Sequence, residues 1–244
     1  MDTISKLNIV EAKKGSPPYP RRMERLLCSK APELLLMMGN VSLLDKDALG
    51  FCGSRDVTEK GLRIARDCTE QAVQLSRVII SGNARGVDRA VHKTALECGG
   101  ETILVLAEGM QSFYINTELR SVWDWNRVLV ISEFAHNATW KTWHAMQRNR
   151  TILSLVSAMI VIEAGKQGGT IAAGKDALKF GVPLFVVNRE DVQSSLGGVY
   201  LLERGGFRLN KSNKTGRANM KQVFSIVEKI QRIPVGRYAQ TTLF

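Results

Sequence analysis

From residue 48 onward, short apolar runs alternate with longer segments of helical periodicity. The apolar runs are residues 48–52, 78–80, 102–106, 128–131, 159–162 and 182–187. Near-continuous runs of this kind are typical of parallel strands that are covered on both faces. Helices are expected between them, at 58–75, 88–98, 112–122, around 152–156 and at 170–180. The pattern therefore predicts an α/β fold with a doubly wound, mostly parallel sheet.

The two ends of the chain interrupt this alternation. Residues 1–45 are polar and proline-rich, with a short helix at 21–29 and an apolar run at 34–38 that favours an edge strand. We therefore expect residues 1–45 to be an arm packed on a core of residues 46–205. Residues 206–244 are expected to form a basic C-terminal extension with one helix.

Charge changes the picture at the C-terminal end. The chain of 244 residues has a net charge of +11. Between residues 204 and 237 nine Lys and Arg face one acid, Glu228. A basic surplus of this kind favours a polyanionic partner, most often nucleic acid. The alternative is a tail that only keeps the protein soluble.

Several classes of protein are not favoured. No apolar run approaches the roughly 18–20 residues that span a bilayer, and the first 30 residues lack a signal-peptide core. A cytoplasmic protein with no membrane partner is expected. The three histidines show no metal-ligand spacing, and Cys52 and Cys98 are expected to be buried free thiols. We expect neither a metal nor a cofactor.

Candidate chemistry begins at the turn Ser81–Asp88, between an apolar strand and a helix. Gly82 and Gly86 let the backbone approach a ligand or adopt positive φ, and Arg85 supplies a planar donor fork suited to phosphate. An ordinary tight turn with a solvated arginine remains an alternative. Two similar turns, Gly53-Ser54-Arg55 and Gly165–Thr170, make an anion site more attractive.

The carboxyl ends of parallel strands lie at one edge of a sheet, where α/β proteins bind ligands. We therefore expect the three turns to converge on a phosphate pocket that also receives Arg148-Asn149-Arg150. Ion pairing on a helix surface is the alternative for Arg148 and Arg150. The candidate binding residues are Gly53, Ser54, Arg55, Ser81, Gly82, Arg85, Gly86, Arg148, Asn149, Arg150, Lys166, Gly168, Gly169 and Thr170.

Aromatic residues lie close to these cations in the sequence. All four tryptophans fall between residues 123 and 143, where the chain is expected to be irregular from 132 to 146. Aromatics among cations suit the stacking of unpaired bases beside phosphate contacts. Trp140 and Trp143, in a polar context, are the stacking candidates. Trp123 and Trp125 are expected to pack against the sheet or in a dimer interface.

The sequence favours binding over catalysis. Residues 169–175 match G-x-x-x-x-G-K, but Asp176 replaces the hydroxyl residue that would hold Mg²⁺, and the match falls in an expected helix. No intact G-x-G-x-x-G is present. No Ser/His/Asp set or paired carboxylates stand out, so we predict no catalytic residues.

Taken together, the motifs resemble a known family. They are Gly53-Ser54-Arg55, Ser81–Asp88, Gly99–Leu106, and Arg148-Asn149-Arg150 with Glu163-Ala164-Gly165. In this order, over roughly residues 19–205, they resemble the DNA-processing protein A (DprA/Smf) family. The resemblance implies an extended Rossmann-like fold, a homodimer that binds single-stranded DNA, and transfer of that DNA to a RecA-type recombinase during DNA uptake. It also implies that Arg55, Arg85 and Arg148 or Arg150 hold phosphates.

Two features depart from the family pattern or point elsewhere. Glu108 stands where the family usually has a small neutral residue, and it would repel phosphate unless paired.

Related Rossmann proteins sense nucleotides or, in the LOG-type group, hydrolyse nucleoside monophosphates in the same pocket. Because the pocket is shared, a nucleotide sensor or LOG-type hydrolase is the alternative function. The hydrolase alternative is weakened because the LOG-type motif has a catalytic carboxylate where this chain has Ala173.

Overall fold

One nine-stranded sheet organises the computed structural model, which describes residues 8–187 and 196–231. The sheet order is β1-β2-β6-β5-β4-β3-β7-β8-β9. The strands are β1 Val10–Lys13, β2 Leu34–Gly39, β3 Ala48–Gly53, β4 Val78–Ser81, β5 Thr102–Val105, β6 Val128–Ser132, β7 Ala158–Ile162, β8 Leu184–Val187 and β9 Phe207–Leu209. All neighbours from β6 to β9 pair in parallel, whereas β1–β2 and β2–β6 are antiparallel. The predicted doubly wound, mostly parallel sheet is confirmed.

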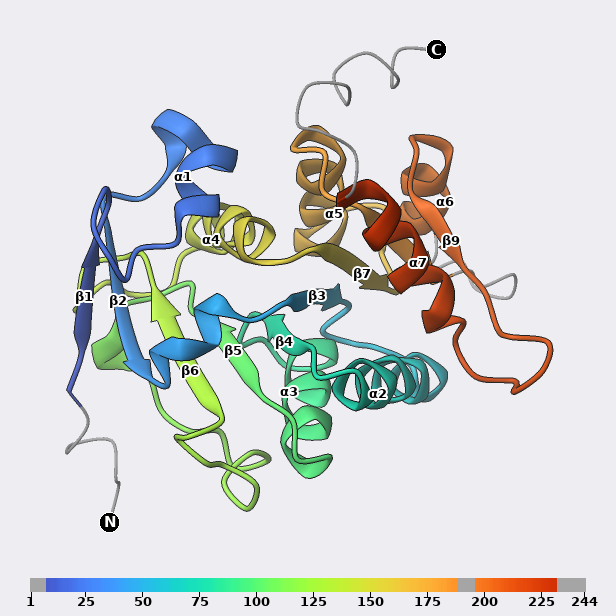
Figure 1. Cartoon of the computed structure of the whole chain (residues 1–244), viewed down its shortest axis with the longest axis horizontal. Coiled ribbons are helices and arrows are strands. Elements are labelled where there is room, and N and C mark those ends of the chain that lie inside the picture. The colour runs from blue at the N-terminus through green and yellow to red at the C-terminus, as the bar shows by residue number, and fades with distance from the viewer. Residues whose placement is uncertain (1–7, 188–195, 232–244) are drawn as a thin grey trace.

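Helices cover both faces of this sheet (Figure 1). Their bounds are α1 Arg21–Leu27, α2 Glu59–Gln74, α3 Val87–Glu97, α4 Thr142–Leu155, α5 Gly169–Lys179, α6 Leu196–Glu203 and α7 Met220–Gln231. On one face α1, α4, α5 and α6 bury their apolar side chains in one core cluster. On the other face α2, α3 and α7 share a second cluster. Among the described residues, no helix is long and apolar enough to cross a membrane.

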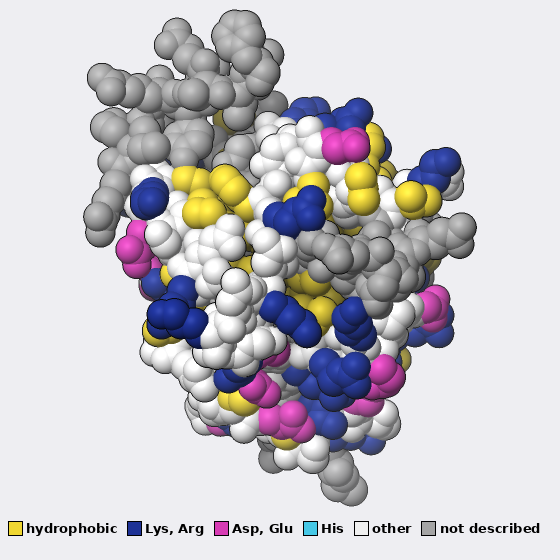
Figure 2. All heavy atoms as spheres, turned by 90° about the vertical axis from the view of Figure 1, so that its right-hand side faces the viewer, with side chains coloured by type: hydrophobic (Ala, Val, Ile, Leu, Met, Phe, Trp, Pro, Cys, Tyr) yellow, Lys and Arg dark blue, Asp and Glu magenta, His cyan; other side chains and the backbone are white. Residues whose placement is uncertain are grey.

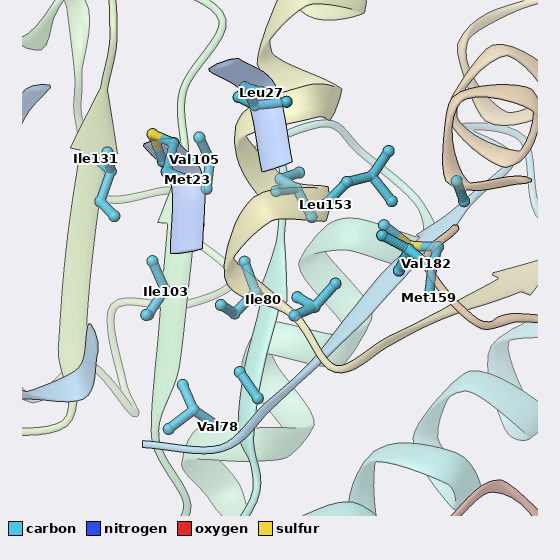
Figure 3. Close-up of a cluster of buried hydrophobic side chains, with 14 of the residues drawn as sticks. Met23, Leu27, Val78, Ile80, Ile103, Val105, Ile131, Leu153, Met159 and Val182 are labelled. Carbon is cyan, nitrogen blue, oxygen red and sulfur yellow. The ribbon is translucent and has the colours of Figure 1, made fainter. Parts of the chain in front are cut away.

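The first core cluster shows how distant segments meet over the sheet. Met23 of α1, Leu153 of α4 and Val105 of β5 belong to this cluster, part of which Figure 3 shows. Met23, Leu153 and Val105 are each completely buried. Each side chain of this size contributes about 1.5–3 kcal/mol when it leaves water. The N-terminal arm is thereby fixed to α4, the helix that carries the candidate arginines.

The N-terminal arm differs from its prediction in one respect. The run at 34–38 forms β2 as expected, but β2 is not an edge strand because β1 pairs with it. Strand β1 has only one buried side chain, Ala12. A strand with a single buried residue leaves no apolar run in the sequence, so the pattern could not indicate it.

Two segments between β5 and β7 were predicted wrongly. The expected helix at 112–122 is a 3₁₀ turn, Met110–Ser112, followed by turns. There the Asn116 side chain accepts the Glu118 backbone N–H, an Asx turn that competes with helix formation. Conversely, the expected irregular stretch 132–146 ends at Thr142, where α4 begins. The first two turns of α4 bury His144 and Arg148 rather than apolar residues, so they lack an apolar period.

The basic extension docks onto the core through a polar contact as well as through α7. The Arg217 guanidinium pairs with Asp67 and, at 2.9 Å, with Glu70 on α2. Asp67 Oδ2 also accepts the Ala218 backbone N–H at 2.6 Å. One of the basic residues counted in the extension is therefore neutralised by α2.

The cysteines are free thiols. Cys98 is exposed, whereas the sequence analysis predicted that it would be buried.

Candidate functional site

The site lies where the sheet reverses its winding, between β3 and β7. The chain leaves β3 through α2 on one face and enters β7 through α4 on the other face, so a crevice opens at the carboxyl ends of these strands. Two adjoining cavities occupy it, of about 620 Å³ and about 270 Å³. Both are lined by Arg55, Ala84, Trp140 and Arg148, which separate them.

Glycines allow the first two turns to touch. A Cβ on Gly53 would lie 2.3 Å from the Ile162 carbonyl oxygen of β7. Gly86 has a φ of +81°, and its Cβ would lie 2.4 Å from the Ser54 carbonyl oxygen. Only glycine permits this approach, because backbone atoms cannot move aside cheaply. Gly53 and Gly86 therefore shape the cleft, while Ser54 lines its larger cavity.

The turn Ser81–Asp88 is braced from within. The buried Asp88 carboxylate accepts the Ala84 backbone N–H at 3.2 Å, and Ser81 Oγ lies 2.9 Å from Asp88 Oδ1. Beneath the turn, His92 Nε2 lies 2.7 Å from the Gly82 carbonyl oxygen. Burial lowers the His92 pKa to about 4, so the neutral ring donates Nε2–H to that carbonyl. Ser81 therefore stabilises the turn.

Arg148 is the buried cation of the cleft. Its guanidinium lies against the backbone of Gly82, where an added Cβ would be 1.8 Å from Nη1. Burial lowers its pKa, and the nearby Asp88 charge opposes that change. Its Nε has no hydrogen-bond partner, and within residues 8–187 and 196–231 no ion pair of Arg148 is formed. A buried guanidinium that lines both cavities without a paired acid is suited to hold an anion.

Arg150 points elsewhere, although it follows Arg148 by only two positions. Its Nε lies 3.5 Å from Asp176 Oδ2 on α5, and it lines neither cavity. The alternative of a helix-surface ion pair thus describes Arg150. Between them, Asn149 lines the larger cavity and donates from Nδ2 to the Gly169 carbonyl oxygen at 3.4 Å.

The third turn presents the start of α5 to the larger cavity. Gly168, Gly169 and Thr170 line that cavity, and Gly168 is the N-cap with a φ of +107°. The first backbone N–H groups of a helix lack intrahelical partners and favour negative charge. This end of α5 is a second place where an anion can be held. Lys166, in the same turn, is exposed and lines neither cavity.

Two exposed arginines stand at the mouth of the cleft. Arg85 lines the smaller cavity and pairs with Asp56 at 2.6 Å, although both side chains are largely in solvent. Such an exposed pair is weak and can be replaced by a ligand phosphate. The Arg55 guanidinium lies over the Trp140 ring, 5.5 Å from its centroid. Arg55 and Trp140 thus place a cation and an aromatic ring side by side in the lining of both cavities.

Trp143 is placed differently from Trp140. It lies in the first turn of α4 and packs edge-on against Phe134 and His144, with ring centroids 6.5 Å and 3.9 Å away. It is exposed but lines neither of the two cavities. Its role in stacking stays a prediction. Trp123 and Trp125 pack with Phe113 in the third core cluster, as expected.

Several lining residues escaped the sequence analysis. Asn83, Arg89, Met146 and Gln167 line the cavities, and Glu108 lies in the smaller one. Arg89 directly follows the turn Ser81–Asp88 in the first turn of α3, and this position in the sequence could have identified it as a lining residue. Among the described residues, no group of three or more His, Cys, Asp or Glu side chains is arranged to hold a metal ion.

Comparison with known proteins shows which family the chain matches. A family model described as DNA recombination-mediator protein A matches residues 12–217. The DNA processing protein DprA of Streptococcus pneumoniae is 31% identical over 186 residues, which cover 75% of this chain and 65% of that protein. The chain thus spans less than two thirds of that relative.

Two solved structures have the same fold. The X-ray structure of DprA from Streptococcus pneumoniae aligns with a TM-score of 0.73 and 28% identity, over 83% of this chain and 71% of that chain. DprA from Helicobacter pylori aligns with a TM-score of 0.73 and 20% identity, over 93% of this chain and 96% of that chain. The Helicobacter pylori protein is described as having a unique single-stranded DNA binding mode.

Proposed function

This chain belongs to the DNA recombination-mediator protein A family, and from that premise we propose that its cleft binds single-stranded DNA. The family resemblance read from the motifs is confirmed. Binding by phosphate contacts fits the cations of the cleft, and the exposed Trp140 face fits an unpaired base. The description of the Helicobacter pylori protein supports the same ligand.

The observation that carries this proposal is the environment of Arg148. A buried guanidinium that makes no ion pair with an acid is costly to maintain unless a ligand supplies the counter-charge. Arg85 lines the smaller cavity, the start of α5 lines the larger one, and Arg55 lines both. Anion sites spaced along a cleft suit a chain of phosphates better than one phosphate.

We propose binding without catalysis. Ala173, whose position would hold the carboxylate of the LOG-type motif, lines the larger cavity with a methyl group. A methyl group cannot act as an acid or base, so hydrolysis of a nucleoside monophosphate lacks its main catalytic group. Incubation with AMP followed by chromatography tests this alternative directly. Release of adenine would replace the binding proposal with an enzymatic one.

Binding of single-stranded DNA should depend steeply on salt. The smaller cavity is lined by Arg55, Arg85, Arg89 and Arg148. If these four arginines contact phosphates, the slope of log K against log salt is about −3 for a single strand. The affinity for oligo-dT should then fall on the order of 50-fold between about 50 mM and about 200 mM salt. Fluorescence anisotropy measures the affinity at both salt concentrations, and no binding at the lower salt would contradict the proposal.

Trp140 and Trp143 form a matched pair for testing base stacking. Trp140→Ala removes an exposed ring that lines both cavities, and stacking of one base on an aromatic ring is worth about 1–3 kcal/mol. We expect affinity for oligo-dT to fall about 5- to 150-fold. Trp143→Ala should have a smaller effect, since its ring packs on Phe134 and His144. Equal losses in anisotropy titrations would contradict this assignment.

Two finer proposals follow from the family. We propose that the protein dimerises and that it hands its strand to a RecA-type recombinase. Figure 2 views the face of α6 and β9, where hydrophobic side chains lie between Lys and Arg. Leu196 and Val199 of α6 and Phe207 of β9 are the exposed apolar residues of these elements, which supports self-association. Sedimentation velocity tests the dimer, and a recombinase filament-assembly assay tests the transfer.

A further inference from the structure

The smaller cavity combines cations with one carboxylate. Of its lining residues, Glu108 alone is acidic, and it lies with Asn83, Trp140 and the arginines. The Glu108 backbone is fixed, because Ser132 Oγ donates to its carbonyl oxygen at 2.6 Å. The volume of about 270 Å³ equals that of roughly nine liquid water molecules, which is room for one nucleobase.

The arginines of this cavity do not neutralise Glu108. Arg85 pairs with Asp56, and Arg89 pairs with Glu118 at 3.4 Å. Within the described parts of the chain, no hydrogen bond or ion pair reaches the Glu108 carboxylate. Burial raises its pKa, whereas a carboxylate held by a guanidinium would have a lowered one. Glu108 is therefore not simply a counter-ion of the cleft.

A free carboxylate discriminates among bases by their hydrogen-bond donors. Guanine presents N1–H and the N2 amino group side by side, and both can donate to one carboxylate. Thymine presents a single N3–H between two carbonyl oxygens, which a carboxylate repels. Adenine and cytosine each place an acceptor nitrogen beside their amino group, so they offer donors on one side only.

We propose that the smaller cavity selects an unpaired guanine of the bound strand. The base enters beside Trp140, its N1–H and N2 amino group donate to the Glu108 carboxylate, and the arginines hold the flanking phosphates. The carboxylate that opposes phosphate binding thus gains a function once a base stands between it and the backbone. This inference rests on the proposed binding of single-stranded DNA.

Competition anisotropy with single-stranded oligonucleotides tests the inference. The probes are oligo-dT and the same strand with isolated thymines replaced by guanine, hypoxanthine or adenine; isolated guanines avoid quadruplexes. One good bidentate contact is worth about 1–3 kcal/mol, so guanine strands should bind about tenfold more tightly than oligo-dT. Hypoxanthine, which lacks the N2 amino group, should fall between them. Equal affinities for guanine and thymine strands would overturn the inference while leaving the proposed function intact.

Glu108→Ala should abolish the ratio between guanine and thymine strands, because guanine strands lose the contact to the carboxylate while oligo-dT binds no more weakly than before. Glu118→Ala is the matched control, because it also removes one acid near Arg89 but lies outside both cavities. It should keep the ratio. A guanine preference that survives in Glu108→Ala, with thermal unfolding unchanged, would overturn the assignment. Absence of binding to every strand at low salt would instead overturn the proposed function, and this inference with it.

Discussion

Replacing Arg148 by alanine should lower the affinity for single-stranded DNA by about 30- to 100-fold. This corresponds to about 2–3 kcal/mol, the usual loss when one partner of a buried charge pair is removed. Arg148 is the buried guanidinium shared by both cavities, so its contact to a phosphate is less screened by solvent than that of an exposed arginine. Anisotropy titrations with oligo-dT at low salt measure the change.

Arg150→Ala is the matched control. The two arginines have the same chemistry and lie in the same helix, but Arg150 faces Asp176 on α5. We expect its replacement to change affinity by no more than about 2- to 3-fold, the effect of one distant charge. Arg148→Ala should leave thermal stability almost unchanged, because it removes a cation without an acid partner. If both variants lose affinity equally, the cleft does not contain the main phosphate site.

Gly82→Ala should reduce binding almost as much as Arg148→Ala, although alanine removes no polar group. Its Cβ would lie 1.8 Å from Nη1 of Arg148 and 2.4 Å from its Cζ. The guanidinium is the mobile end of a long side chain, so it moves out of its position while the backbone remains. We expect affinity to fall about 10- to 50-fold and stability by about 1–3 kcal/mol.

The double variant makes this prediction specific. If Gly82→Ala acts by displacing Arg148, the variant carrying both changes should bind no more weakly than Arg148→Ala alone. Gly169→Ala serves as the control, since it adds a methyl group at the cleft where nothing lies within 4 Å. It should reduce binding less than Gly82→Ala. Additive losses in the double variant would mean that Gly82 contacts the strand itself.

The parts of the fold that the sequence predicted are those held by apolar burial. Strands such as Val128–Ser132 are buried along their whole length, and the residues 128–131 form an unbroken apolar run. Strand β1 went unpredicted because pairing with β2, not burial, holds it in place. The segment 112–122 was misjudged because an Asx turn competes with the helix that its composition favours. In both cases hydrogen bonds between distant or local polar groups decide the structure.

The sequence indicated where the cleft lies better than it indicated which residues line the cleft. Glycine turns after apolar strands located the cleft, because parallel strands bring their carboxyl ends together. Arg148 and Arg150 could not be distinguished, since residues two apart on a helix face nearly opposite ways. Only the packing of α4 decides which of them turns inward, and the polar first turns of α4 give no apolar period to show it.

The two ends of the sheet bear on how copies of this chain can meet. Strand β1 is four residues long and carries Glu11 and Lys13, and β9 at the other end is three residues long and carries Arg208. Short, charged outer strands discourage backbone pairing between molecules, which is a common route to aggregation. Self-association of this protein should therefore use side chains rather than strand pairing, and a fragment lacking residues 1–40 should aggregate, because it turns β6 into an open edge strand.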